Sequence, residues 1–213
     1  MDNKSNAILE NIPKTYDQKF SKEDIEREKE FKIQQIERNI INSGVPERQR
    51  LCEPDLKNAL GEKLDLMKSE IHTGMLYALI GKRGTGKTQC AVQLIKYACN
   101  KKISAKYAVT MDFFMDIKET YKTHADSTEA RVLKDYLKPQ FLILDEIHER
   151  GESEWENRLL THMIDKRYGA LKDTILISNQ THDVFCMSIG NSILSRLNET
   201  GGIIVCNWES FRG

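Results

Sequence analysis

The sequence predicts an α/β protein in which helices cover both faces of a parallel sheet, giving three layers. Five short apolar runs alternate with segments whose apolar residues recur at helical spacing. Two of these runs, 75–80 and 141–144, are apolar throughout, which is typical of parallel strands buried on both sides. A glycine-rich segment, 81–88, joins the first run directly to a helix. Strands and helices that alternate in this way form a sheet covered by helices.

Length and composition fit one domain with an appendage. The 213 residues are 39% hydrophobic, which is enough for a core, and the 32 acidic and 32 basic side chains cancel. The zero net charge argues against charge-driven coating of nucleic acid but allows a local basic groove. Five scattered cysteines are typical of reduced thiols, and no apolar run reaches membrane-spanning length. We therefore expect a cytoplasmic protein without a signal peptide or a membrane partner.

We divide the chain into an N-terminal extension, residues 1–50, and a main domain, residues 51–213. Residues 1–20 are polar and without a clear period, so we expect them to be loose or ordered only on a partner. One helix is expected over 21–43, with Ser21 as its N-cap and Gly44 as its end. Its isoleucine stripe is narrow, so this helix must dock on its own domain or on a partner.

The main domain is expected to begin with a helix near 55–70. Strands are then expected at 75–80, 103–110, 141–144, 174–178 and 203–208. Helices are expected at 89–100, 112–122, 127–137, 154–168 and 189–197.

The segment 81–88 fits the phosphate-binding pattern G-x-x-x-x-G-K-[ST], the P-loop. It consists of Gly81, Lys82, Arg83, Gly84, Thr85, Gly86, Lys87 and Thr88. Its glycines let backbone N–H groups turn toward phosphate oxygens, and the following helix adds its partial positive charge. Lys87 can reach the outer phosphates of a nucleoside triphosphate, and the Thr88 hydroxyl can ligate Mg²⁺.

An acidic pair, Asp145-Glu146, follows the buried run 141–144. A carboxylate at the end of a buried strand is costly unless it has a function. We expect Asp145 to hold Mg²⁺ and Glu146 to polarise the water that attacks the γ-phosphate. Plain helix capping is the alternative, and the P-loop disfavours it. The pair also begins D-E-x-H, a helicase signature. We reject the helicase assignment, because such helicases need two domains of this kind and the chain has room for one. We expect His148 at the surface or behind the site.

Asn179 ends the apolar run 174–178, where it could sense the γ-phosphate or the attacking water. Its alternative role is an Asx turn. Arg196 and Arg212 could also supply positive charge to phosphoryl transfer. Position alone does not assign either arginine, because a lone arginine is usually a solvated surface residue.

Several further segments resemble the AAA+ ATPases of the DnaC helicase-loader and IstB transposition-helper group. The resemblance rests on the P-loop, Asp145-Glu146, Asn179, and the segments 43–48, 165–168, 189–197 and 207–212. It covers roughly residues 43–213, and the order and spacing of the segments are more specific than any one of them.

This resemblance implies a doubly wound, five-stranded P-loop core of the ASCE type without a full lid domain. It implies ATP as the nucleotide, Arg196 as an arginine finger that completes the site of an adjacent subunit, and Arg212 as a sensor near the nucleotide. Members of the group form rings or spirals that bind single-stranded DNA and control a hexameric replicative helicase. We therefore expect an ATPase, converting ATP and water to ADP and phosphate, that self-associates with ATP and loads or regulates such a helicase.

Two alternatives stay open. The first is an IstB-like helper ATPase that recruits a transposase. The second is a nucleotide-gated adaptor with negligible turnover, against which the intact Asp145-Glu146 pair argues.

Basic and aromatic residues near the second strand are candidates for binding single-stranded DNA. The basic candidates are Lys101, Lys102, Lys106, Lys118 and Lys122. Phe113, Phe114 and Tyr121 could stack on bases, although core aromatics and solvated lysines are the more frequent case.

Overall fold

The five predicted strands form one parallel sheet, which confirms the α/β class. The computed structural model describes residues 21–52 and 59–211, and the strand order is β2-β3-β4-β1-β5. The strands are β1 (Leu76–Gly81), β2 (Ala105–Val109), β3 (Phe141–Asp145), β4 (Asp173–Ser178) and β5 (Gly201–Cys206). Because all paired strands are parallel, they end at the same edge of the sheet.

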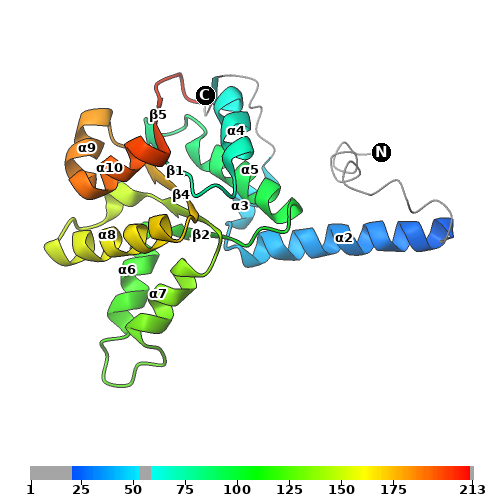
Figure 1. Ribbon diagram of the computed structural model, residues 1–213, viewed down its shortest axis with the longest axis horizontal. Helices are drawn as coiled ribbons and strands as arrows, with labels where there is room; N and C mark the ends of the chain where they lie inside the picture. The colour runs from blue at the N-terminus through cyan, green and yellow to red at the C-terminus, as the bar shows by residue number, and fades with distance from the viewer. Residues whose placement is uncertain (1–20, 53–58, 212–213) are drawn as a thin grey trace.

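Helices cover both faces of this sheet (Figure 1). One face carries α4 (Ala59–Glu70) and α5 (Lys87–Asn100). The other carries α6 (Thr110–Glu119), α7 (Glu129–Leu137), α8 (Glu154–Gly169), α9 (His182–Ile189) and α10 (Asn191–Thr200). Strand β1 serves both cores, because Tyr77 and Leu79 face the first and Leu76, Ala78 and Ile80 the second.

Among residues 21–52 and 59–211, two α-helices were not predicted. Helix α3 (Glu47–Leu51) follows Pro46 and is too short to show a helical period. Helix α9 is separated from α10 by Gly190, whose φ of +83° ends one helix and starts the next. We predicted only one helix, 189–197, because 182–188 mixes polar and apolar residues. None of the helices within residues 21–52 and 59–211 is long and apolar enough to cross a membrane.

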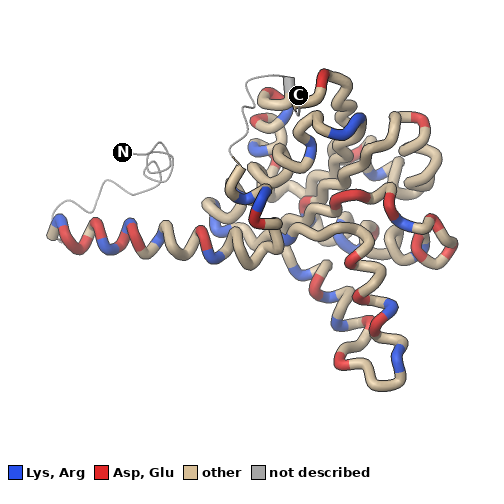
Figure 2. The backbone as a smooth tube through the Cα atoms, turned by 180° about the vertical axis from the view of Figure 1, so that it is seen from behind, with Lys and Arg blue, Asp and Glu red and all other residues tan. Residues whose placement is uncertain are grey.

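Helix α2 (Lys22–Asn42) leaves the body of the protein as a long arm (Figure 1). Ser21 and Asp24 form a capping box at its start. Ile36 and Ile40 pack against the core beside α5, yet no described side chain of α2 is fully buried. Acidic and basic residues alternate along the arm (Figure 2). Docking on its own domain thus involves only the last turns of α2, and the rest faces solvent.

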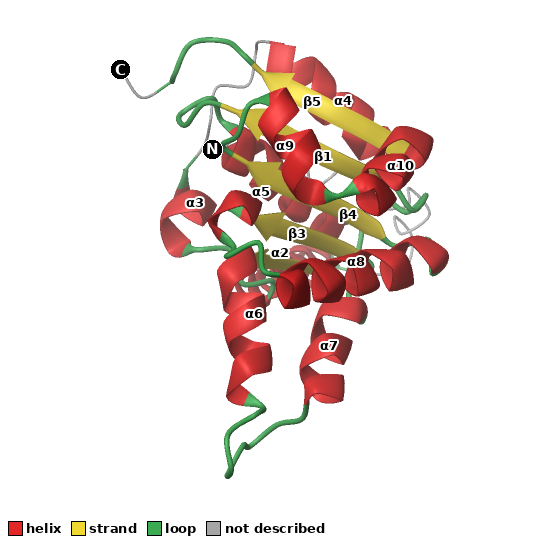
Figure 3. Ribbon diagram, turned by 90° about the vertical axis from the view of Figure 1, so that its left-hand side faces the viewer, coloured by secondary structure: helices red, strands yellow, loops and turns green. Residues whose placement is uncertain are grey.

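Helices α6 and α7 form a hairpin that projects from the sheet (Figures 1 and 3). Phe113 and Phe114 lie fully buried at its base, where Phe113 packs on Tyr136. These two phenylalanines therefore belong to the core, and the base-stacking alternative is wrong for them. Tyr121, near the hairpin tip, is exposed, and its hydroxyl donates to Glu129.

The basic candidates do not share one surface. Lys101 and Lys102 precede β2 and so lie toward the amino-terminal edge of the sheet, whereas Lys118 and Lys122 lie at the far end of α6. Lys106 lies over the ring of Tyr136. Lys118 forms an ion pair with Glu156 of α8, and Lys122 forms one with Glu119, three residues before it.

Candidate nucleotide-binding site

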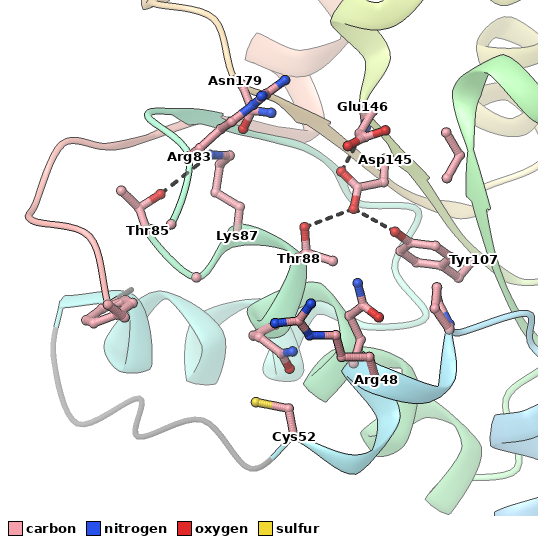
Figure 4. Close-up of a pocket in the computed structure, with 17 residues that line it drawn as sticks. Arg48, Cys52, Arg83, Thr85, Lys87, Thr88, Tyr107, Asp145, Glu146 and Asn179 are labelled. Carbon is pink, nitrogen blue, oxygen red and sulfur yellow. Dashed lines mark hydrogen bonds between the residues drawn. The ribbon is translucent and has the colours of Figure 1, made fainter. Parts of the chain in front are cut away.

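A cavity of about 920 Å³ opens at the edge where the strands end. Its walls come from the loop after β1, the ends of β2 and β3, Asn179 after β4, and helix α3 (Figures 3 and 4). In parallel α/β sheets ligands bind outside the carboxyl ends of the strands. Motifs that are far apart in the sequence thus meet in one cavity because each follows a strand.

The loop 81–88 curls around the N-terminus of helix α5. Gly81, Gly84 and Gly86 have φ angles of +125°, +84° and +84°, which L side chains rarely adopt. At Gly81 a side chain would also collide with the carbonyl of Cys206 on β5. The glycines are therefore required by the shape of the loop, and this shape aims N–H groups and the start of α5 at one point.

Lys87 is buried within this loop, with 4% of its surface exposed. Its Nζ donates to the carbonyl oxygens of Gly81 and Lys82, each at 2.7 Å. These carbonyls keep the ammonium at the centre of the loop. A bound phosphate would offer Nζ negatively charged acceptors, which make stronger hydrogen bonds than carbonyls do.

The carboxylate of Asp145, at the end of β3, accepts hydrogen bonds on both of its oxygens (Figure 4). Its Oδ2 accepts from the Thr88 hydroxyl at 2.9 Å and from the Tyr107 hydroxyl at 2.7 Å. Its Oδ1 accepts from the Glu146 N–H at 2.8 Å. Burial, and then the negative charge of Asp145, raise the pKa of Tyr107 well above its ordinary value, so the phenol remains protonated and donates.

This set of oxygens fits Mg²⁺. A carboxylate and a hydroxyl 2.9 Å apart are hard donors, and Mg²⁺ typically takes one or two protein oxygens together with phosphate oxygens and waters. Asp145 and Thr88 would hold the ion, as the sequence predicts. The alternative for the acidic pair was helix capping, but here the Asp145 side chain turns into the cavity toward α5.

Glu146 has φ 55° and ψ 42°, a left-handed conformation that is unusual for a residue other than glycine. The residue is exposed and lines the cavity, whereas its neighbours Asp145 and Ile147 are buried. This turn of the backbone lets one carboxylate hold the loop while the next faces the cavity. A general base needs such access to water.

Asn179 lines the cavity and contacts His148, which sequence analysis placed only at the surface or behind the site. The Asn179 N–H donates to His148 Nδ1 at 3.3 Å, and His148 Nε2 lies 3.1 Å from Glu149. Glu149 in turn pairs with Arg83 of the glycine loop at 3.3 Å. The four residues form a chain of polar contacts that joins the end of β4 to the loop.

Arg196 lies on α10, and it is not among the described residues that line the cavity. Its guanidinium pairs with Asp165 of α8 at 3.0 Å, donates to Ser192, and lies over the ring of Tyr168. The structure therefore does not bring Arg196 to the nucleotide site of its own chain. Arg212, the other predicted arginine, lies outside the described residues.

A segment at the end of the described chain, 207–211, crosses the glycine loop. The Trp208 indole N–H donates to the Thr85 carbonyl at 2.9 Å, and the Phe211 N–H donates to the Gly84 carbonyl at 2.9 Å. The sequence indicates a role for this segment only through its resemblance to the family, and it predicts neither these contacts nor the position of Tyr107 in the cavity. Helix α3, whose Arg48 and Gln49 line the opposite wall, was not predicted either.

Comparisons with known proteins identify an ATP-binding family. The model of a family described as IstB-like ATP binding protein matches residues 65–213. The replicative helicase loader DnaC of Buchnera aphidicola subsp. Baizongia pistaciae is 26% identical over 133 residues, and DnaC of Escherichia coli (strain K12) is 23% identical over 133 residues. Each alignment covers 62% of this chain and 54% of the relative, so the chain spans about half the length of these curated relatives.

Solved structures show the same fold. The crystal structure of the DnaC helicase loader aligns at a TM-score of 0.61 and 22% identity, covering 74% of this chain and 94% of that one. DnaI aligns at 0.62 and 14% identity, covering 79% and 94%. The replication initiator DnaA bound to AMPPCP and single-stranded DNA aligns at 0.61 and 20% identity, covering 76% and 50%. The predicted AAA+ P-loop fold is confirmed.

Proposed function

This chain belongs to the family of IstB-like ATP-binding proteins, and we propose that it is a magnesium-dependent ATPase that loads or regulates a hexameric replicative helicase. The reaction is hydrolysis of ATP to ADP and phosphate. The observation that carries the proposal is the Thr88–Asp145 hydrogen bond of 2.9 Å, formed in the same cavity as Lys87 and Glu146.

Each residue has a role that its position supports. Lys87 and the N–H groups of the loop bind the β- and γ-phosphates. Glu146 accepts a proton from the attacking water, and Asn179 orients that water or the γ-phosphate. A bound Mg²⁺, held by Thr88 and Asp145, supplies positive charge for the negative charge that develops on the phosphate oxygens.

Arg196 is proposed to act on the nucleotide of a neighbouring copy. It lies on α10, outside its own cavity, so a contact with phosphate requires a second chain. ATP would then favour assembly into a ring or spiral, and hydrolysis would favour release. Arg212 is proposed as a second arginine near the nucleotide, on the resemblance alone.

The partners are proposed from the relatives. Two relatives carry the name replicative helicase loader, and one solved DnaA neighbour holds single-stranded DNA. We assign no DNA-binding surface, because the basic candidates lie at different ends of the molecule.

The test is ATP hydrolysis by the purified chain with Mg²⁺, with and without a single-stranded oligonucleotide, followed by co-sedimentation with the replicative helicase of the host. We expect turnover that rises with protein concentration and with DNA, and ATP-dependent association with the helicase. Glu146→Gln should bind ATP and the helicase but turn over poorly. ATP binding without turnover by the wild-type chain would instead favour the nucleotide-gated adaptor.

The IstB-like transposition helper remains the second candidate, because the matching family model is described as IstB-like ATP binding protein. The same co-sedimentation with a transposase in place of the helicase distinguishes the two. Binding to the transposase alone would reject the helicase role and leave the ATPase proposal intact.

A further inference from the structure

Tyr107 joins the metal-holding carboxylate to the base of the α2 arm. We propose that Tyr107 is a positioning residue for Mg²⁺ binding, whose hydroxyl holds Asp145 and whose main chain ties this position to the end of α2. The inference rests on the ATPase function proposed above.

The first step is the hydrogen bonding of Asp145. A carboxylate has about four sites for donors. Three are taken, by the hydroxyls of Thr88 and Tyr107 on Oδ2 and by the Glu146 N–H on Oδ1. The Asp145 side chain is therefore held from three directions, and the site that is left on Oδ1 is available to the ion or to one of its waters.

The donors to Asp145 differ in what else they would have to hold. Thr88 would share its hydroxyl with Mg²⁺, because the oxygen has lone pairs for the ion besides the hydrogen that it donates to Asp145. The Tyr107 hydroxyl is not among the proposed ligands of the ion. Tyr107 is 7% exposed and packs in the core, and its hydroxyl donates to Oδ2 at 2.7 Å. Within the described part of the chain, Tyr107 is thus the side chain whose sole polar contact in the site is with Asp145, and it fixes the orientation of that carboxylate.

The main chain of Tyr107 contacts the segment that ends α2. Strand β2 is at the edge of the sheet, and the free side of Tyr107 is taken by the end of α2. The Tyr107 N–H donates to the Ser43 carbonyl at 2.6 Å. Gly44 packs so closely that an added Cβ would lie 2.8 Å from the Tyr107 carbonyl oxygen. A displacement of the base of α2 therefore acts on the residue that holds Asp145.

Tyr107→Phe removes the hydroxyl and keeps the ring. We would measure binding of a fluorescent N-methylanthraniloyl ATP as a function of Mg²⁺ concentration, and again in EDTA. The half-saturating Mg²⁺ concentration should rise about tenfold, as expected for the loss of a group that orients a metal ligand. Affinity in EDTA should stay at the wild-type value, because Lys87 and the loop are untouched.

The matched control is Tyr136→Phe. Tyr136 is also buried, and its hydroxyl also donates to an aspartate, Asp116, at 3.0 Å, but it lies outside the cavity. This variant should bind Mg²⁺ as the wild type does. The proposal is overturned if Tyr107→Phe keeps its half-saturating Mg²⁺ within about twofold of the wild type, or if it loses nucleotide affinity equally with and without Mg²⁺, which a merely structural role predicts.

A wild-type chain that binds the nucleotide without any response to Mg²⁺ would overturn the proposed metal-dependent function, and the positioning role with it. A wild-type chain that responds to Mg²⁺ beside a Tyr107→Phe variant that responds equally overturns the positioning role alone. The two failures are therefore distinguishable in one data set.

The link to α2 has its own test. Gly44→Ala places a methyl group against the Tyr107 carbonyl and should also raise the half-saturating Mg²⁺ concentration, by about threefold or more. In a Tyr107→Phe background it should add little. Gly190→Ala is the matched control, since Gly190 has φ +83° against +84° for Gly44 but no atom within 4 Å of its added Cβ. Equal behaviour of the two alanine variants would overturn the link to α2.

Discussion

Lys87, Thr88, Asp145 and Glu146 share one cavity, whereas Arg196 lies on α10 in an ion pair with Asp165 of α8. We call the first four residues the cavity group. Lys87, Thr88 and Asp145 are held by hydrogen bonds within the cavity, and Lys87 is only 4% exposed. The Arg196 side chain is 24% exposed, and its partner Asp165 is 40% exposed.

The cavity group and Arg196 thus differ in what each needs for its proposed role. The cavity group is in place within one chain, around a single cavity. Arg196 has to leave Asp165 before it can reach any phosphate. A partly exposed ion pair of this kind contributes on the order of 1 kcal/mol, so a neighbouring copy with bound ATP can displace it.

Glu146→Gln should have the largest effect on the cavity group. Loss of the general base should lower turnover about 10³-fold while ATP affinity is kept. Phosphate release under saturating ATP measures the rate, and a calorimetric titration measures the affinity. Glu149→Gln is the control, because Glu149 is a nearby exposed carboxylate that pairs with Arg83. Turnover that survives in the Glu146 variant would place the base elsewhere.

Lys87→Ala should come next. Removing the buried ammonium from the phosphate site should weaken ATP binding about 10²-fold, the effect expected for the loss of one partner of a buried charge pair. The same calorimetric titration checks it. Lys82→Ala, at an exposed position of the same loop, should stay near the wild-type affinity. Tight ATP binding by Lys87→Ala would reject the P-loop assignment.

Arg196→Ala should affect only what depends on a second chain. It should bind ATP normally as a monomer but lose the rise of turnover with protein concentration, about tenfold or more. Mixing it with Lys87→Ala should restore part of that rise, since one variant supplies the cavity group and the other the arginine. A mixture that restores none of it contradicts a role across the interface.

Asp165→Asn should have the opposite effect on assembly to Arg196→Ala. It frees Arg196 from its ion pair but leaves the cavity group unchanged. The protein concentration at half-maximal turnover should fall about twofold to threefold, because the partly exposed pair contributes on the order of 1 kcal/mol or less. A rise in this concentration would mean that Asp165 orients Arg196 for the interface rather than restraining it.

The sequence predicted the parts of the molecule that depend on neighbouring residues. Strands β1 and β3 are apolar runs, and the glycine loop and Asp145-Glu146 are contiguous motifs at the ends of these strands. Helix α9 was missed because 182–188 mixes polar and apolar residues, and because Gly190, which ends the helix, looks like an interior glycine until its φ angle is known. Helix α3 was missed because five residues are too few to show a period.

Contacts between distant segments could not be predicted in this way. Tyr107 reaches Asp145 across 38 residues of sequence, and Trp208 reaches Thr85 across 123. An apolar, aromatic position in a strand predicts a core residue, and nothing local indicates where its hydroxyl or its indole N–H points. Phe113 and Phe114 show the converse, since their place near lysines suggested base stacking but their burial assigns them to the core.

Trp208→Phe tests whether the segment 207–211 supports the glycine loop of the cavity group. The Trp208 indole N–H donates to the Thr85 carbonyl from a segment that also contacts Gly84, so the glycine loop is braced from outside. Loss of one such hydrogen bond should lower the free energy of unfolding by about 1 kcal/mol and weaken ATP binding about threefold. Circular dichroism during urea denaturation measures the first, with Trp155→Phe as a control on the opposite face of the sheet. Because Arg196 lies on α10, away from this hydrogen bond, turnover should depend on protein concentration as it does in the wild type. A change in that dependence without a change in ATP affinity would mean that the segment 207–211 serves the interface between copies rather than the loop.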